Sequence, residues 1–265
     1  SMQVYKDIKI LTARPLEKDC KIIKHHLYGF QSGRKKFSTG EWLKLATKKI
    51  YEIKERKKIP ILVGGTGLYF KALVEGLVEI PTIPLKLRNK VRQLQKKLGQ
   101  KKFYKKLLKI DPSSINKIKS TDTQRSIRAY EIKIFTKKSM IEWHENTKSN
   151  FKKKNFYKII IEFPRTELIE KIQYRAAIML RSGAIREVEK FLKLKIPKDK
   201  SLWKAIGIHE IDQYLKKKID KKNAIEKISI KTRQYAKRQM TWARGHMQSW
   251  KRIKTKRLNI FLKNI

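Results

Sequence analysis

The sequence predicts an α/β fold, because strand and helix patterns alternate in its N-terminal part. Ser38 and Glu41 have the S-x-x-E form of a capping box, and an amphipathic helical pattern follows them. That helix leads into the apolar run at 61–63, which is typical of a parallel strand buried on both faces. Glycines end the run, and a second helical pattern begins at Leu68.

The loop after the expected strand, Gly64–Gly67, is the strongest candidate for a ligand site. Glycine allows a positive φ and lets a backbone approach a ligand closely. Ligands of open α/β sheets bind beyond the carboxyl ends of strands, where this loop is expected. Thr66 in the loop is placed either to cap the next helix or to bind a substrate group. A tight connection without a ligand explains a lone glycine loop equally well.

Composition divides the chain into an α/β core and an insertion. We expect the core at 1–80 and 151–265, and a lysine-rich helical insertion at 81–150. The helical segments expected in the insertion are Leu85–Leu98, Phe103–Ile110 and Thr123–Phe135. In the second part of the core, we expect a strand at Phe156–Phe163 and a long last helix at 223–245.

The charge of the chain favours a polyanionic partner. The 265 residues include 68 basic and 23 acidic side chains, which gives a formal net charge of +45. Nucleic acid is the polyanion that such a balance indicates most directly. The 52 lysines against 16 arginines have a second explanation, because an AT-rich coding sequence enriches lysine anywhere in a proteome.

Cysteine content and hydropathy limit the remaining classes. Cys20 is the one cysteine, which excludes an intrachain disulfide and a cysteine metal site and suits a reducing cytosol. No apolar run approaches the roughly 18 residues of a membrane span, and no signal-peptide pattern opens the sequence. We therefore expect a cytoplasmic protein without a membrane partner.

Short motifs occur in a fixed order along nearly the whole chain. They are Ser1–Lys6, Thr12–Pro15, His25–Leu27, Leu62–Tyr69, Ala72-Leu73, Glu75–Leu77, Asp122, Gln124-Arg125, Arg128-Ala129, Glu131, Lys204–Gly207, Thr232–Gln234, Ala236–Gln239 and Trp242. Each is weak by itself, and the ordered set is highly specific. Together they resemble the tRNA dimethylallyltransferases, also called tRNA isopentenyltransferases.

The resemblance implies a P-loop-NTPase-like parallel sheet core with an inserted helical domain that grips the anticodon stem-loop of tRNA. The implied reaction transfers a dimethylallyl group from dimethylallyl diphosphate to N6 of the adenine 3′ to the anticodon, which gives N6-isopentenyladenosine. The target adenine is flipped out of its stack. Mg²⁺ is the implied cofactor and leaves with diphosphate, and we expect a monomer. ATP binding stays open, because a P-loop holds any diphosphate.

The resemblance also implies roles for individual residues. Thr66 is the implied catalytic residue, with helix capping as the alternative. The implied tRNA-binding residues are Ser1, Met2, Gln3, Thr66, Arg88, Gln124, Arg125, Ser126, Ile127 and Arg128. Lys204 and Arg233 are implied to bind diphosphate, and core salt bridges are the alternative for Arg233. A solvated helix face is the alternative for Arg88. No residue of this sequence is implied as a metal ligand.

The sequence departs from the family's pattern at its start. The family's phosphate loop and the aspartate expected as general base precede the segment that begins here at Ser1, and neither occurs in this sequence. The ligands for magnesium are missing with them. Because a phosphate loop stabilises the charge of the leaving group, we expect this chain to be inactive by itself. Leu11 stands where the family usually has glycine.

Three other functions remain open. A non-catalytic RNA-binding fragment would explain the charge, although RNA anchoring does not need the Ser1–Tyr5 and Gly64–Thr66 motifs. A different P-loop transferase, such as a nucleotide kinase, would not need the motifs at 122–131 and 232–242. A decayed gene product is the third alternative. The genomic sequence upstream of Ser1 distinguishes these alternatives.

Overall fold

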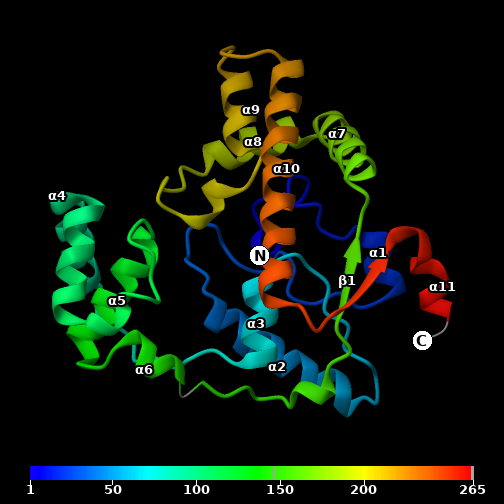
Figure 1. The fold of residues 1–265 in the computed structure, drawn as a ribbon. Coiled ribbons are helices and arrows are strands. Elements are labelled where there is room, and N and C mark those ends of the chain that lie inside the picture. The colour runs from blue at the N-terminus through cyan, green and yellow to red at the C-terminus, as the bar shows by residue number, and fades with distance from the viewer. Residues whose placement is uncertain (146, 264–265) are drawn as a thin grey trace. The chain divides into compact units, whose positions relative to one another are not determined.

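The computed structural model describes residues 1–145 and 147–263 (Figure 1). They divide into two compact units: Ser1–Lys71 with Lys154–Ile265, and Ala72–Lys153. The divisions lie at different positions from the expected boundaries at 80 and 150. Helix α3 (Gly67–Glu75) runs without a break across the first division, so this division falls inside a helix and not after it, near residue 80, as expected. Its last turn belongs to the smaller unit, where the Ser149 hydroxyl donates to the Leu73 carbonyl at 2.7 Å.

Helices and a small sheet make up the larger unit. Its helices are α1 (Glu17–Ile22), α2 (Thr39–Glu55), the start of α3, α7 (Arg165–Arg181), α8 (Ala184–Lys193), α9 (Ile208–Leu215), α10 (Lys221–His246) and α11 (Leu258–Lys263). Strands β1 (Ile159–Glu162) and β2 (Lys251–Lys254) are parallel, with Ile159 opposite Lys251. A parallel sheet with helices around it confirms the predicted α/β class.

The apolar run at 61–63 does not form the buried strand that its composition predicts. The Ile61 and Val63 side chains are 75% and 81% exposed, and the run has no strand assignment. A parallel strand forms only where neighbouring strands accept and donate its backbone hydrogen bonds. The described sheet pairs only β1 with β2, so this run lacks both a ladder and a cover among the described residues.

The core of the larger unit joins the N-terminal segment to four later helices. Ile8, Phe191, Ile208 and Ile211 are almost fully buried and belong to one apolar cluster that also draws on α7 and α10. Glu187 on α8 strengthens the join, because its carboxylate accepts backbone N–H groups from Ile10 and Leu11 at 2.8 and 3.0 Å. Residues near the start of the chain are therefore fixed by helices more than 160 positions later.

Helix α2 begins at the predicted capping box. The Glu41 N–H donates to Ser38 Oγ at 3.1 Å, and the Ser38 N–H donates to Glu41 Oε2 at 2.7 Å. Ala46 and Ile50 from its apolar face are buried. This reciprocal pair satisfies two N–H groups that the first turn of a helix otherwise leaves without partners.

The smaller unit consists of α4 (Leu85–Ile110), α5 (Thr123–Thr136) and α6 (Met140–Glu145). Two of the expected helices are the two halves of α4, which is kinked at Gly99. There φ is 71° and ψ is 165°, a conformation open in practice only to glycine. Helices α4 and α5 pack against each other, and Phe103, Leu107 and Ile132 are fully buried in their core.

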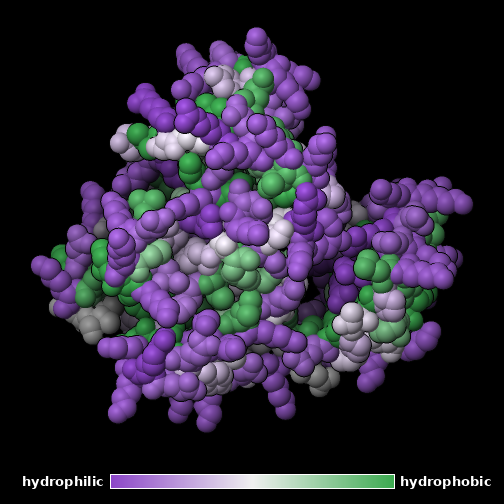
Figure 2. Space-filling model, turned by 180° about the vertical axis from the view of Figure 1, so that it is seen from behind, coloured by the Kyte–Doolittle hydropathy of each residue, from purple (hydrophilic) through white to green (hydrophobic). Residues whose placement is uncertain are grey.

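Polar side chains dominate the surface. Figure 2 shows hydrophilic residues over most of the face in view, in keeping with the net charge of +45. Within 1–145 and 147–263, none of the helices has the length and apolar content that crossing a bilayer requires.

Candidate functional site

The glycine loop at 64–67 lies against helix α10. A Cβ atom on Gly65 would lie 1.9 Å from Gln239 Nε2, and one on Gly67 would lie 2.0 Å from Trp242 Cδ1. None of the loop glycines is among the residues with positive φ, which differs from our expectation. Glycine is required at 65 and 67 because α10 approaches closely, whereas Gly64 faces open space.

The Thr66 hydroxyl meets the start of the chain. The terminal ammonium nitrogen of Ser1 donates to Thr66 Oγ1 at 3.2 Å, across 65 positions of sequence. Within the described residues, the hydroxyl forms its hydrogen bond with Ser1. The first turn of α3 is closed by backbone atoms, because the Tyr69 N–H donates to the Thr66 carbonyl. The side chain therefore does not cap the helix. Two of the predicted site residues are brought together here.

The segment at 1–3 is held in place by its neighbours. The Gln3 carbonyl accepts the Gly29 N–H at 2.8 Å, and Gln3 Nε2 donates to the Ala13 carbonyl at 2.9 Å. Met2 packs against the apolar core of the larger unit. The Gln3 amide oxygen is left as the polar group that this side chain can offer to a ligand.

An aromatic stack supports the first turn of α3. Tyr69 and Trp42 lie face to face, with ring centroids 4.2 Å apart and planes 14° from parallel. Burial, together with the nearby Tyr5 and Glu41, raises the pKa of Tyr69 to about 12, so its phenol stays protonated at neutral pH. The loop that carries Thr66 is thus anchored to α2 on one side and to α10 on the other.

Lys204 and Arg233, the residues expected to bind diphosphate, come from different elements. Lys204 ends a short 3₁₀ helix at Ser201–Lys204 and is exposed, and Arg233 lies half-buried on α10. Among the described residues, neither is ion-paired with an acid, so both charges are available. The structure records no contact between the two side chains.

The turn after Lys204 is fixed by a buried carboxylate. Gly207 has φ of 108°, and its N–H donates to Glu210 Oε2 at 2.9 Å. Lys231 on α10 forms an ion pair with the same carboxylate. Burial opposes ionisation of Glu210, but the hydrogen bonds from Lys231 and Gly207 outweigh it and lower the pKa of Glu210.

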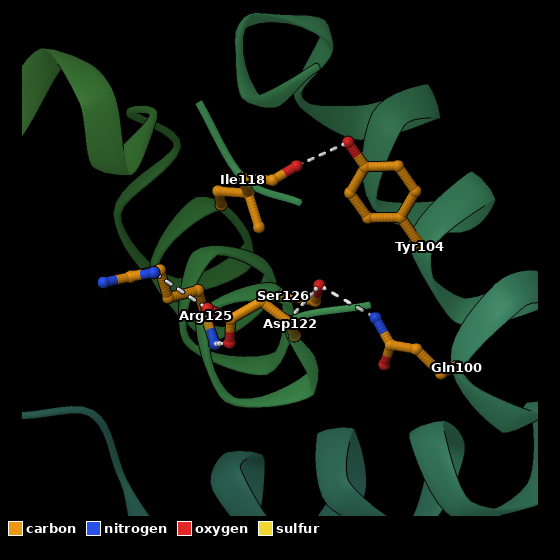
Figure 3. Close-up of polar contacts among 6 residues, drawn as sticks. All are labelled: Gln100, Tyr104, Ile118, Asp122, Arg125 and Ser126. Carbon is orange, nitrogen blue, oxygen red and sulfur yellow. Dashed lines mark hydrogen bonds and ion pairs between the residues drawn. The ribbon is translucent and has the colours of Figure 1, made fainter. Parts of the chain in front are cut away.

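In the smaller unit, the expected tRNA-binding motif occupies the start of α5 (Figure 3). Asp122 caps the helix by accepting the Arg125 N–H at 3.0 Å, and it also accepts Arg125 Nη1 at 2.9 Å. Gln124 and Arg125 are exposed. The structure therefore presents these two polar side chains to solvent from a fixed helix end.

Ser126 and Ile127 differ from our expectation. Ser126 is fully buried, donates to the Asp122 carbonyl at 2.7 Å and accepts from Gln100 Nε2 at 3.1 Å. Figure 3 shows Gln100 reaching it from α4. Ile127 packs against the apolar core of this unit. Both side chains join α5 to its own unit, and their expected role in tRNA binding stays a prediction.

Two expected RNA-binding arginines converge on one acid. Arg88 Nε and Arg128 Nη1 each lie 3.5 Å from Oε2 of Glu131, whose side chain is 1% exposed. The arginine side chains are 37% and 40% exposed. One negative charge faces two positive ones, so the cluster of Arg88, Arg128 and Glu131 keeps a net positive charge. The outer parts of the two arginine side chains reach solvent.

The described residues leave the expected magnesium ion a prediction. They contain no group of three or more His, Cys, Asp and Glu side chains that could hold a metal. We assign no metal ligand.

The side chains that sequence reasoning missed are Trp42, Tyr69, Gln239 and Trp242. The last three belong to the recognised motifs, but the motifs do not reveal which of their side chains meet.

Comparison with known proteins gives a consistent result. The family model described as IPP transferase matches residues 3–246. A tRNA dimethylallyltransferase of Pelagibacter ubique is 59% identical over 100% of this chain and 85% of its own length. One of Rickettsia massiliae is 43% identical over 94% of this chain and 69% of its own length.

Solved structures agree in fold. A tRNA isopentenylpyrophosphate transferase of Staphylococcus epidermidis matches with a TM-score of 0.64 and 30% identity, over 97% of this chain and 84% of that one. A eukaryotic dimethylallyltransferase acting on tRNA matches with a TM-score of 0.78 and 28% identity, over 92% of this chain and 61% of that one.

Proposed function

Because the chain belongs to the IPP transferase family, we propose that it modifies tRNA by transferring a dimethylallyl group from dimethylallyl diphosphate. The observation that carries the proposal is the 3.2 Å contact between the Ser1 nitrogen and Thr66 Oγ1. It joins the two segments whose motifs are expected to hold the acceptor base. We place the reaction in the cytoplasm, where a protein of this kind meets its tRNA.

Thr66 is suited to position the acceptor. A hydroxyl group both donates and accepts hydrogen bonds. The Thr66 side chain can therefore accept from the N–H groups of an exocyclic amine or donate to an acceptor nitrogen of the base. We propose that Thr66 holds N6 of the adenine directly 3′ of the anticodon. The Gln3 amide oxygen, which lies on the same segment as Ser1, is the second polar group available to the base.

The reaction forms a bond between N6 and the terminal carbon of the dimethylallyl group. The bond from that carbon to the diphosphate oxygen breaks, its electron pair leaves on the diphosphate, and the proton that the amine loses passes to water. Orientation of the nucleophile by Thr66 lowers the entropic part of the barrier. Lys204 and Arg233, neither of them ion-paired within the described residues, are proposed to offset the negative charge of the departing diphosphate.

The smaller unit is proposed to bind the anticodon stem-loop. Gln124 and Arg125 extend from the start of α5, and Arg88 and Arg128 carry the net positive charge around Glu131. Positively charged side chains on a rigid scaffold fix an RNA through its phosphates, while splayed loop bases stack or hydrogen-bond to the protein. In this proposal the smaller unit holds the RNA and the larger unit performs the chemistry.

The test is transfer of the labelled dimethylallyl group from dimethylallyl diphosphate to an anticodon stem-loop with adenine 3′ of the anticodon, by protein that carries the family's phosphate loop and aspartate upstream of Ser1. The matched control is the same RNA with a purine that lacks the amine at that one position. We expect label in the first RNA and none in the second. Binding of both RNAs without transfer to either would contradict the proposed enzyme and leave an RNA-binding protein.

A further inference from the structure

Helix α10 contacts the glycine loop on both sides of Thr66. On one side, Gln239 Nε2 donates to the Gly65 carbonyl at 3.0 Å, across 174 positions of sequence. On the other side, the Trp242 indole packs so closely on Gly67 that a Cβ atom there would lie 2.0 Å from two of its ring atoms. The two α10 residues are three positions apart and therefore lie on one helical face.

The part of α10 that makes these contacts is itself fixed. Trp242 stacks on His246 with ring centroids 4.0 Å apart and planes 9° from parallel. Ala243 and Met247, which lie between and beyond them, are buried in a small cluster with Ile160 of β1. The helix end therefore cannot shift without disturbing the sheet, so it is a firm support for the loop.

We propose that Gln239 and Trp242 are positioning residues that hold the Gly65–Gly67 turn and thereby set the place of the Thr66 hydroxyl. The inference rests on the proposed function, since it concerns how Thr66 meets the acceptor amine. Neither residue touches Thr66 Oγ1, which contacts Ser1 instead. They act through the backbone of the flanking glycines.

The chemistry explains why such a support matters. Gly64 is exposed, as are Ile61 and Val63 before it, so this side of the loop is open to solvent within the described residues. Without the Gln239 amide, the Gly65 carbonyl turns to water and the loop gains conformations. A displacement of about 1 Å at a reacting group costs roughly 100-fold in rate. An exposed hydrogen bond contributes little to folding stability by comparison.

The first test replaces Gln239 by leucine, which keeps the size of the side chain and removes the donor. Gln234→Leu is the matched control, because Gln234 is exposed on the same helix and its side chain has no hydrogen bond among the described residues. We expect Gln239→Leu to lower the single-turnover transfer rate about tenfold or more, with tRNA affinity and melting temperature almost unchanged. Gln234→Leu should leave all three quantities unchanged.

The second test asks whether Gly67 and Trp242 act through one contact. Gly67→Ala, Trp242→Leu and the double variant form a cycle. If the indole sets the loop position, the smaller leucine makes room for the new methyl group, and the double variant transfers no more slowly than either single variant. Rate losses that multiply would contradict a shared contact.

The outcomes separate the inference from the function on which it rests. A wild-type rate for Gln239→Leu, in a protein whose wild type is active, overturns the positioning role alone. A rate loss that appears only with an equal loss of folded protein assigns Gln239 to stability and also overturns it. Absence of transfer by wild-type protein that carries the family's phosphate loop and aspartate upstream of Ser1 overturns the proposed function instead.

Discussion

The Arg128 guanidinium lies 3.5 Å from the carboxylate of Glu131, which is almost completely buried. Arg88 shares the same carboxylate oxygen at the same distance. Because a buried carboxylate needs at least one cationic partner, either arginine can serve when the other is removed. The arrangement gives two surface cations a common anchor.

We therefore predict that Arg88→Met and Arg128→Met are not additive in stability. Each single variant leaves Glu131 paired with the other arginine, whose side chain is partly exposed, and should cost about 1 kcal/mol or less. The double variant leaves a buried charge unpaired and should cost more than the sum. Urea unfolding of the four proteins measures the coupling. Adding Glu131→Gln to the double variant should restore part of the loss, and additive values would show that the shared anchor does not exist.

Arg125→Ala should weaken tRNA binding with little effect on donor binding. Arg125 is exposed at the start of α5, where it is proposed to contact one phosphate that the variant would no longer neutralise. The slope of log K against log salt should become shallower by roughly one unit of phosphate neutralisation. Filter binding across a salt series measures this slope. Lys218→Ala, the same charge change at an exposed site of the other unit, should leave it unchanged. Equal effects of the two variants would show that RNA binding is a general property of the charge.

Glu210→Gln should lower stability in a pH-dependent way. The pKa of Glu210 is lowered in the folded protein from its ordinary value of 4.5, so the ionised form stabilises the fold above that pH. The stabilisation is lost as the pH falls through the folded pKa. The difference in melting temperature between wild type and variant should therefore be large at neutral pH and shrink below 4.5. A difference that stays constant through the acid range would remove the Lys231 ion pair from this explanation.

Gly99→Ala should destabilise the kink in α4 although nothing fills the space around it. A Cβ atom at Gly99 would meet no atom within 4 Å, but φ there is 71°. Such a conformation costs a residue other than glycine about 1–3 kcal/mol. Gly64→Ala is the matched control, since it also has open space and is not among the residues with positive φ. Chemical denaturation of both variants separates strain from crowding, and equal stabilities would contradict the strained kink.

Several helices of the fold could be predicted from local sequence rules. The Ser38 cap, the last long helix and the two halves of α4 follow from capping, periodicity and one glycine, which depend on neighbours within a few residues. The run at 61–63 fails for a physical reason. A strand needs partners, and composition does not say whether a neighbouring strand is there to pair with it.

The candidate site shows the same limit. The composition of the glycine loop makes it a candidate site, and the resemblance points to Thr66. The contact of Gln239 with Gly65 spans most of the chain, so no local pattern reveals it. Ser126 lies inside a motif and is buried, because the helical period turns it toward α4 while Gln124 and Arg125 face solvent.

The Thr66 hydroxyl is proposed to hold the acceptor amine, and the proposed mechanism depends on this contact. The most direct measurement is the single-turnover rate of dimethylallyl transfer for Thr66→Val and Thr66→Ser, with thermal melting of both. Valine keeps the shape of threonine and removes the hydroxyl, and serine keeps the hydroxyl. We predict a rate about 100-fold lower for Thr66→Val and close to the wild type for Thr66→Ser, with both melting normally. A wild-type rate for Thr66→Val would contradict the account.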